Sequence, residues 1–169
     1  MTDIALRLWR DDDLWLLHRA NTAAMTAHLN GPESDADVAD RHARYLRYAD
    51  NGEARMFVIL QGTRAVGSIG YWNVSWREQE ALETGWFVLP EAQGQGIASR
   101  AIVLLLDDVR RHRGDRHLLL ACPETDNPAS NAICRSAGFQ LLGTTTATFR
   151  GAELVMNEWV LELEAPGAS

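Results

Sequence analysis

The chain contains no lysine, since all sixteen of its Lys and Arg residues are arginines. Its longest unbroken apolar run is the six residues 101–106, far short of the roughly 20 residues that a membrane-spanning helix needs. The amino terminus carries Asp3 and alternates apolar with charged residues, so it lacks the basic flank and apolar run of a secretion signal. These absences predict a cytoplasmic protein without a membrane partner, and the all-arginine usage indicates a bacterial source.

Cysteine is also scarce, with only Cys122 and Cys134 in the chain. A secreted domain of this size more often carries a larger disulfide framework, and two cysteines are too few for a structural metal site, so we expect a reducing compartment and no metal. The formal net charge of −7 argues against nucleic acid as a partner. The dense basic cluster at 110–113 fits either the solvated carboxyl end of a helix or a phosphate contact.

Hydrophobic periodicity organises the rest of the chain. A length of 169 residues with 46% hydrophobic content predicts a single domain over 1–169 with a frayed tail over 164–169. Periodicity and capping residues predict, in order, a strand, two helices, three strands, a helix, a strand, a helix and two strands. The strands are expected at 4–8, 56–60, 66–72, 82–89, 118–121, 139–142 and 154–163, with a polar connection over 75–80. This order predicts a mixed sheet with helices on both faces.

A glycine-containing loop follows the strand expected at 82–89. In the segment 90–98, Gly94 and Gly96 let the backbone approach a ligand closely, and the free amides at the start of the next helix favour an anion such as pyrophosphate. The loop lacks the Gly-Lys-Ser/Thr of a Walker loop and the third glycine of a dinucleotide fingerprint. A glycine pair by itself also fits an ordinary tight turn.

Two motifs together point to a known family. The pattern Gln93-x-x-Gly96-x-Ala98 resembles the Gln/Arg-x-x-Gly-x-Gly/Ala signature of the GNAT superfamily of N-acetyltransferases, and the segment 127–139, ending in Gly-Phe, resembles the late helix of that family. Element order extends the resemblance from about Ile4 to Leu163, and the chain resembles the ribosomal-protein N-terminal acetyltransferase branch. The resemblance implies an α/β GNAT fold, with a mixed, mostly antiparallel seven-stranded sheet and about four helices on its two faces.

The resemblance implies acetyl-CoA as the co-substrate. Loop and helix amides would hold its pyrophosphate, and the strand before the loop would pair with its pantetheine arm in a V-shaped gap beside 118–121. Asn127 would touch the cofactor, although it also fits a plain helix N-cap, and Asn131 lies one turn later. The expected cofactor-binding residues are Trp86, Phe87, Val88, Gln93, Gly94, Gln95, Gly96, Ile97, Ala98, Ser99, Asn127 and Asn131.

The candidate catalytic residues are Glu83 and Cys134. Many family members have, at the position of Cys134, a tyrosine that protonates the departing thiolate. Cys134 fits a weak acid, a buried small hydrophobe or an acyl-accepting nucleophile, and its helical position suggests that it faces the cofactor. Direct attack needs a neutral amine and a proton acceptor. Glu83 is the candidate base, directly or through a water, although an outward-facing strand charge is the competing interpretation; Glu124 is the fallback. A backbone amide near Val88 would stabilise the oxyanion.

These residues predict an N-acetyltransferase that moves an acetyl group from acetyl-CoA to a primary amine, on a small molecule or a protein amino terminus, by direct attack in a ternary complex. Segment 28–33 and the final hairpin are expected to flank the acceptor. The alternatives are a catalytically weak CoA-binding sensor or partner-binding module, and transfer of a longer acyl group. Many family members dimerise through their last strands, so a homodimer is a candidate assembly.

Overall fold

The computed structural model of the chain describes residues 2–164, so the predicted frayed tail lies outside the described residues except for Glu164. The strands are β1 (Ile4–Leu8), β2 (Ala54–Gln61), β3 (Arg64–Trp76), β4 (Gln79–Val88), β5 (Leu118–Ala121), β6 (Gln140–Phe149) and β7 (Ala152–Glu162). The helices are α1 (Leu14–Ala20), α2 (Asp35–Asn51), α3 (Ile97–His112) and α4 (Pro128–Ser136), with short 3-10 turns η1 (Asp11–Asp13), η2 (Ala27–Leu29) and η3 (Pro90–Ala92).

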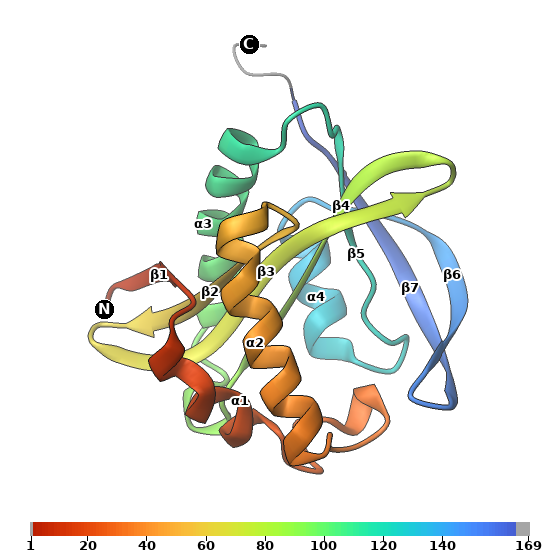
Figure 1. Cartoon of the computed structure of the whole chain (residues 1–169). Helices are drawn as coiled ribbons and strands as arrows, with labels where there is room; N and C mark the ends of the chain where they lie inside the picture. Colours follow the sequence, from red (N-terminus) through yellow and green to blue (C-terminus); the bar gives the residue numbers. More distant parts are fainter. Residues whose placement is uncertain (1, 165–169) are drawn as a thin grey trace.

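The seven strands form one sheet in the order β1-β2-β3-β4-β5-β7-β6 (Figure 1). Neighbouring strands are antiparallel except β4 and β5, which are parallel and are connected through α3. The predicted three-strand meander is therefore β2-β3-β4, and the predicted pairing of the last two strands is that of β6 with β7. The mixed, mostly antiparallel seven-stranded sheet is confirmed.

Helices cover both faces of the sheet, as predicted (Figure 1). Leu16, Leu17 and Val38 of α1 and α2 pack with Met56 and Val58 of β2 in one core cluster. On the other face, α3 and α4 bury the apolar side chains of a larger cluster against β3, β4 and β5. Because successive strand residues point to opposite faces, the strands β2, β3 and β4 contribute to both cores. Among the described residues, no helix is both long enough and apolar enough to span a membrane.

Two predicted boundaries were wrong. The polar stretch 75–80 is not a loop, because β3 continues to Trp76 and β4 begins at Gln79, so only Arg77 and Glu78 form the turn. Both turn residues have positive φ, 48° and 65°, as a two-residue hairpin turn of the primed type requires. Likewise β6 runs to Phe149 rather than ending at Leu142, because pairing with β7 supplies its backbone hydrogen bonds.

Candidate active site

The central strands β4 and β5 separate part-way along their length. They pair only where residues 82–84 face residues 119–121. Beyond Thr84, β4 continues to Val88 without β5 as a neighbour, while the chain after β5 turns toward β7 and forms an isolated bridge from Glu124 to Met156. This separation leaves one edge of 85–88 free and creates the V-shaped gap that the family resemblance implies.

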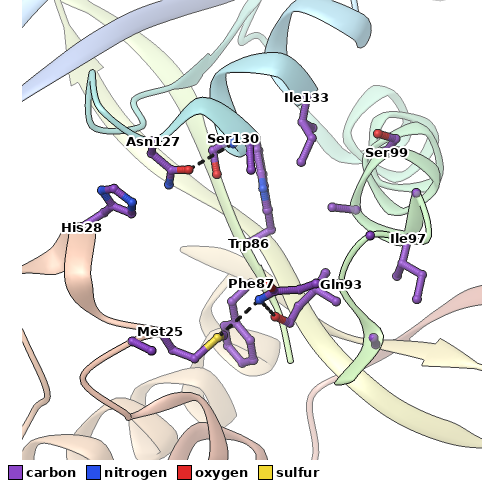
Figure 2. Close-up of a pocket in the computed structure, with 17 residues that line it drawn as sticks. Met25, His28, Trp86, Phe87, Gln93, Ile97, Ser99, Asn127, Ser130 and Ile133 are labelled. Atoms are coloured by element: carbon purple, nitrogen blue, oxygen red, sulfur yellow. Dashed lines mark hydrogen bonds between the residues drawn. The ribbon is translucent and has the colours of Figure 1, made fainter. Parts of the chain in front are cut away.

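A cavity of about 550 Å³ opens at this gap. Figure 2 shows that four segments face it: the loop after α1, the end of β4, the glycine loop leading into α3, and the first turns of α4. Its lining residues are Ala24, Met25, His28, Trp86, Phe87, Val88, Ala92, Gln93, Gly94, Gly96, Ile97, Ala98, Ser99, Asn127, Ala129, Ser130 and Ile133. The structure thus brings the two sequence motifs together around one cavity, although about thirty residues separate them in the chain.

The glycine loop has the backbone conformation that an anion site needs. Gly94 and Gly96 have φ of 76° and 71°, in the left-handed region, which glycine adopts without steric cost. A Cβ built on either residue would meet nothing within 4 Å, so the space in front of the loop is open. Gly96 is the N-cap of α3 and offers no side chain to the first-turn amides. The amides of the first turn therefore remain available to a ligand.

The two glutamines of the loop have different surroundings. The amide of Gln93 donates to the backbone oxygen of Val88 at 2.9 Å and lies 3.6 Å from the sulfur of Met25 (Figure 2). Gln93 thereby ties the loop back onto the end of β4. The side chain of Gln95 instead accepts from Gln61 at 2.9 Å on the exposed side of the loop, and Gln95 is not among the lining residues.

On the α4 side, the three residues predicted to share one face have separate surroundings. The Asn127 oxygen accepts from the backbone N–H of Ser130 at 3.2 Å, so this side chain is the N-cap of α4 and also lines the cavity. Asn131 and Cys134 do not line it. The cause is that Asn127 has φ −101° and ψ 83°; a non-helical N-cap does not fix which face of the following helix points inward. Ser130 and Ile133 occupy the inward face.

Asn131 is fully engaged within the protein. It donates to the backbone oxygens of Glu124 and Asn127 at 3.0 and 2.8 Å, and its own oxygen accepts from Asn157 and Trp159, both at 2.8 Å. These bonds join the loop after β5, the start of α4 and β7. Asn131 therefore has a structural role: it holds the segments behind the cavity wall together.

Cys134 lies in the main core and has no exposed surface. Burial raises the pKa of its thiol to about 12. A nucleophilic cysteine needs accessible thiolate, and an acid needs to reach the leaving group. The surroundings of Cys134 match the second of the three interpretations, a small buried hydrophobe.

Glu83 lies on the opposite face of the sheet from the wall formed by Trp86 and Val88. Strand alternation puts it on the same side as Phe87, which packs against the α1 and α2 core. The indole N–H of Trp72 donates to the Glu83 carboxylate at 3.2 Å, and the Cys122 thiol lies near enough to this carboxylate to lower its pKa. Burial raises the pKa of Glu83 above its ordinary value, and the Trp72 N–H and the Cys122 thiol oppose the rise. Glu83 therefore lies in the paired stretch of β4 just before the gap opens after Thr84, and it is not among the residues that line the cavity.

The fallback base, Glu124, is tied to the loop before α2. His28 Nδ1 lies 3.3 Å from a Glu124 oxygen and 3.1 Å from an Asp126 oxygen. Farther along this loop, Asn30 donates to the backbone oxygen of Arg150 in the β6–β7 turn at 2.9 Å. The predicted flanking segments 28–33 and β6–β7 thus contact each other. His28, Glu124 and Asp126 also have ligand atoms within 4.8 Å of one another, a spacing that could hold a metal ion, and no other such group is found among residues 2–164. Acetyl transfer requires no metal ion.

The basic cluster 110–113 belongs to the carboxyl end of α3. The helix has 16 residues, so this end lies about 24 Å from the glycine loop at 1.5 Å per residue. The distance rules out a contact with a pyrophosphate bound at that loop. Arg113 instead donates to the backbone oxygen of Arg116 at 2.8 Å.

Comparison with known proteins agrees with this geometry. The family described as acetyltransferase (GNAT) domain matches residues 3–140. The chain belongs to the GNAT acetyltransferases. This confirms the class of enzyme expected from the two motifs, an acetyl-CoA-dependent N-acetyltransferase, and the assignment covers most of the chain.

Individual relatives support the same placement. The chain is 28% identical over 133 residues to the ribosomal-protein-serine acetyltransferase of Escherichia coli K12, covering 77% of this chain and 73% of the relative. The Salmonella typhimurium acetyltransferase that modifies the N-terminal serine of ribosomal protein L7/L12 has a TM-score of 0.81 at 22% identity, over 97% of each chain. The Vibrio cholerae spermidine N-acetyltransferase, solved with CoA and spermine, has a TM-score of 0.78 at 18% identity, over 95% of each chain. At these identities, the two structures show a shared fold.

Several residues of the site were missed from the sequence. Met25 reaches the cavity from the loop after α1, and no local pattern marks a residue that arrives from a distant loop. His28 belongs to the segment 28–33 that was expected to flank the acceptor, and it also lines this cavity. Ser130 and Ile133 lie three residues apart and so share one face of α4. They could have been found if the inward face had been assigned from residues within the helix and not from its N-cap. Cys122 carried no signal beyond its position at the end of a short apolar strand.

Proposed function

We propose that the chain binds acetyl-CoA in the cavity between β4 and α4 and transfers the acetyl group to a primary amine that arrives at Glu83 from the other face of the sheet. The observation that carries this proposal is the separation of β4 from β5 after Thr84, with the glycine loop at its mouth. The amides of Gly94 to Ser99 hold the pyrophosphate, and the free edge of Trp86 to Val88 pairs with the pantetheine arm. Asn127 contributes its amide group beside the cofactor.

Glu83 acts as the general base in this proposal. Attack on the thioester carbonyl needs the amine in its neutral form, and the proton lost from nitrogen needs an acceptor. A buried carboxylate whose pKa is raised toward the working pH is a better acceptor than an exposed one. The backbone N–H near Val88 stabilises the oxyanion, and the CoA thiolate takes its proton from water, because the Cys134 thiol is enclosed in the core.

The acceptor is an amine on a small molecule or a protein amino terminus. The curated relative acts on a ribosomal-protein serine and a structural neighbour on spermidine, so both acceptor kinds belong in the test. We further propose a cytoplasmic, bacterial enzyme that forms one domain over residues 1–169, requires neither nucleic acid nor membrane, and forms a homodimer.

The first experiment is calorimetric titration of acetyl-CoA into the purified protein, with Gly96→Trp as the variant that fills the loop. Binding to the wild type and not to the variant is the expected result. Released CoA thiol is then measured with peptides bearing an amino-terminal serine, with spermidine and with simple monoamines. Binding without turnover on any amine would favour the CoA-binding sensor or partner-binding module, and absence of binding to the wild type would remove the proposal altogether.

A further inference from the structure

Three side chains from β3, β4 and the residue after β5 lie on the face of the sheet that α1 and α2 cover. Trp72 of β3 faces Glu83 of β4 directly across the antiparallel ladder, and Cys122 follows the last residue of β5 that pairs with β4. The Glu83 carboxylate accepts a hydrogen bond from the Trp72 indole N–H at 3.2 Å, and the Cys122 thiol is its other neighbour that lowers its pKa. All three side chains are partly buried.

The position of the Trp72 ring depends on a glycine in β4. A Cβ on Gly85 would lie 3.0 Å from Cη2 of the Trp72 indole, which is tighter than ordinary van der Waals contact. The absence of a side chain at Gly85 therefore lets the indole lie across β4 with its N–H directed at Glu83. Gly85 has no positive φ, so packing against Trp72, and not backbone conformation, is the reason for glycine here.

Cys122 is held in its donor form. Burial, and next the negative charge of Glu83, raise the pKa of the Cys122 thiol to about 12. A thiol that stays protonated at neutral pH can donate to a carboxylate but cannot compete with it as a base. The negative charge of Glu158 on β7 also raises this pKa, so the Cys122 thiol remains neutral.

We propose that Trp72 and Cys122 are positioning residues for the acetyl transfer: together they fix the Glu83 carboxylate just before the β4–β5 gap opens, with Gly85 making room for the indole. The inference rests on the proposed role of Glu83 as base. Two fixed donors leave the remaining carboxylate lone pairs directed toward the face where the amine arrives. They also stabilise the ionised form, so losing either donor makes Glu83 harder to ionise.

The test is the pH dependence of kcat/KM with one acceptor amine throughout, so that the titration of the amine itself is common to all variants. Trp72→Phe keeps the aromatic bulk and removes the N–H, and Cys122→Ala removes the thiol. Each is expected to move the acid limb upward by about one pH unit. Cys122→Ser retains a donor and is expected to keep the limb near that of the wild type. Gly85→Ala, which displaces the indole without touching Glu83, is expected to act like Trp72→Phe.

Trp76→Phe is the matched control. Trp76 also lies on β3 and its indole N–H also donates to a carboxylate, that of Glu158, at 2.8 Å. Its removal costs a comparable hydrogen bond away from Glu83, so the acid limb is expected to stay in place. Thermal melts separate folding defects from the pH effect, because a merely structural role lowers stability without moving the limb.

The outcomes separate this inference from the proposed function. A limb that stays at the wild-type pH in Trp72→Phe or in Cys122→Ala overturns the positioning role of that residue while leaving acetyl transfer intact. A Glu83→Gln variant with the same limb as the wild type overturns Glu83 as the base. A wild-type protein that acetylates no amine overturns the proposed function itself.

Discussion

Replacing Gly96 by alanine separates the conformational role of the loop from its role in binding. Gly96 has φ 71° and Gly114, just beyond the other end of α3, has φ 62°. A Cβ on either would meet nothing within 4 Å, so neither substitution creates a clash. Each costs about 1 kcal/mol of folding free energy for the left-handed backbone, which lowers Tm by about 2 to 4 °C in a chain of this size.

The two variants are expected to differ only toward the cofactor. At Gly96 the new methyl group enters the open space in front of the first-turn amides, where the pyrophosphate of acetyl-CoA is proposed to lie. We expect the Kd for acetyl-CoA to rise at least about tenfold, which corresponds to about 1.4 kcal/mol. Gly114→Ala is expected to bind as the wild type does, because it lies at the far end of the helix.

Calorimetric titration and thermal melts of the three proteins make the comparison. Equal loss of stability in the two variants establishes that the backbone costs match. If Gly96→Ala then binds acetyl-CoA with the wild-type Kd, the loop does not hold the pyrophosphate and the cofactor placement is refuted. Weaker binding by Gly114→Ala would equally refute the reasoning, since it would mean that loss of stability alone lowers affinity.

Three other substitutions test separate parts of the structure. Glu83→Gln is expected to lower kcat/KM at least about a hundredfold. Because the pKa of Glu83 is raised in the folded protein, ionising this carboxyl costs stability as the pH rises above its ordinary pKa of 4.5. The variant should therefore have a higher Tm than the wild type at pH 7 and the same Tm at pH 4. Asn131→Ala leaves the Trp159 N–H unpaired and should cost about 2 kcal/mol in denaturant titrations. Asp108→Asn weakens a bidentate pair with Arg55 at 2.7 and 2.9 Å and should cost about 2 kcal/mol at pH 7; because the folded Asp108 pKa is lowered, this loss should shrink as pH falls through that pKa.

Most of the fold could be predicted because its elements carry strong local signals. Helix α3 has both an apolar stripe and a glycine start, and β5 is a short continuous apolar run, typical of a strand buried on both faces. The order of these elements then leaves few topologies. What failed was local: the turn at Arg77 and Glu78 uses positive φ without glycine, and no turn residue of the usual kind marks it.

The candidate site also has parts that the sequence predicted and parts that it did not. The glycine loop was predictable as an anion site because its backbone amides belong to consecutive residues, which a sequence motif can identify. Asn131 was assigned to the cofactor by helical spacing from Asn127, but Asn127 is the N-cap that precedes α4 and has non-helical dihedral angles, so its side chain does not mark the inward face of the helix. The contacts of Trp72 and Cys122 with Glu83 join three strands, and sequence periodicity contains no information on which strands become neighbours.

In the proposed reaction, the separation of β4 from β5 lets acetyl-CoA and the amine approach the reacting atoms from different sides. The cavity is lined by Trp86 and Val88, which point to the α3 and α4 face, and also by Phe87 and Met25, which pack with the α1 and α2 core, so it reaches through the gap toward the face to which Glu83 points. A gap in the sheet lets a thioester on one face meet an amine on the other without crossing a ladder of hydrogen bonds. Closing the gap by extending β5 along β4 would satisfy more backbone groups and stabilise the sheet, yet it would separate the base from the cofactor. The free edge at residues 85–88 is therefore a cost in stability that the reaction requires.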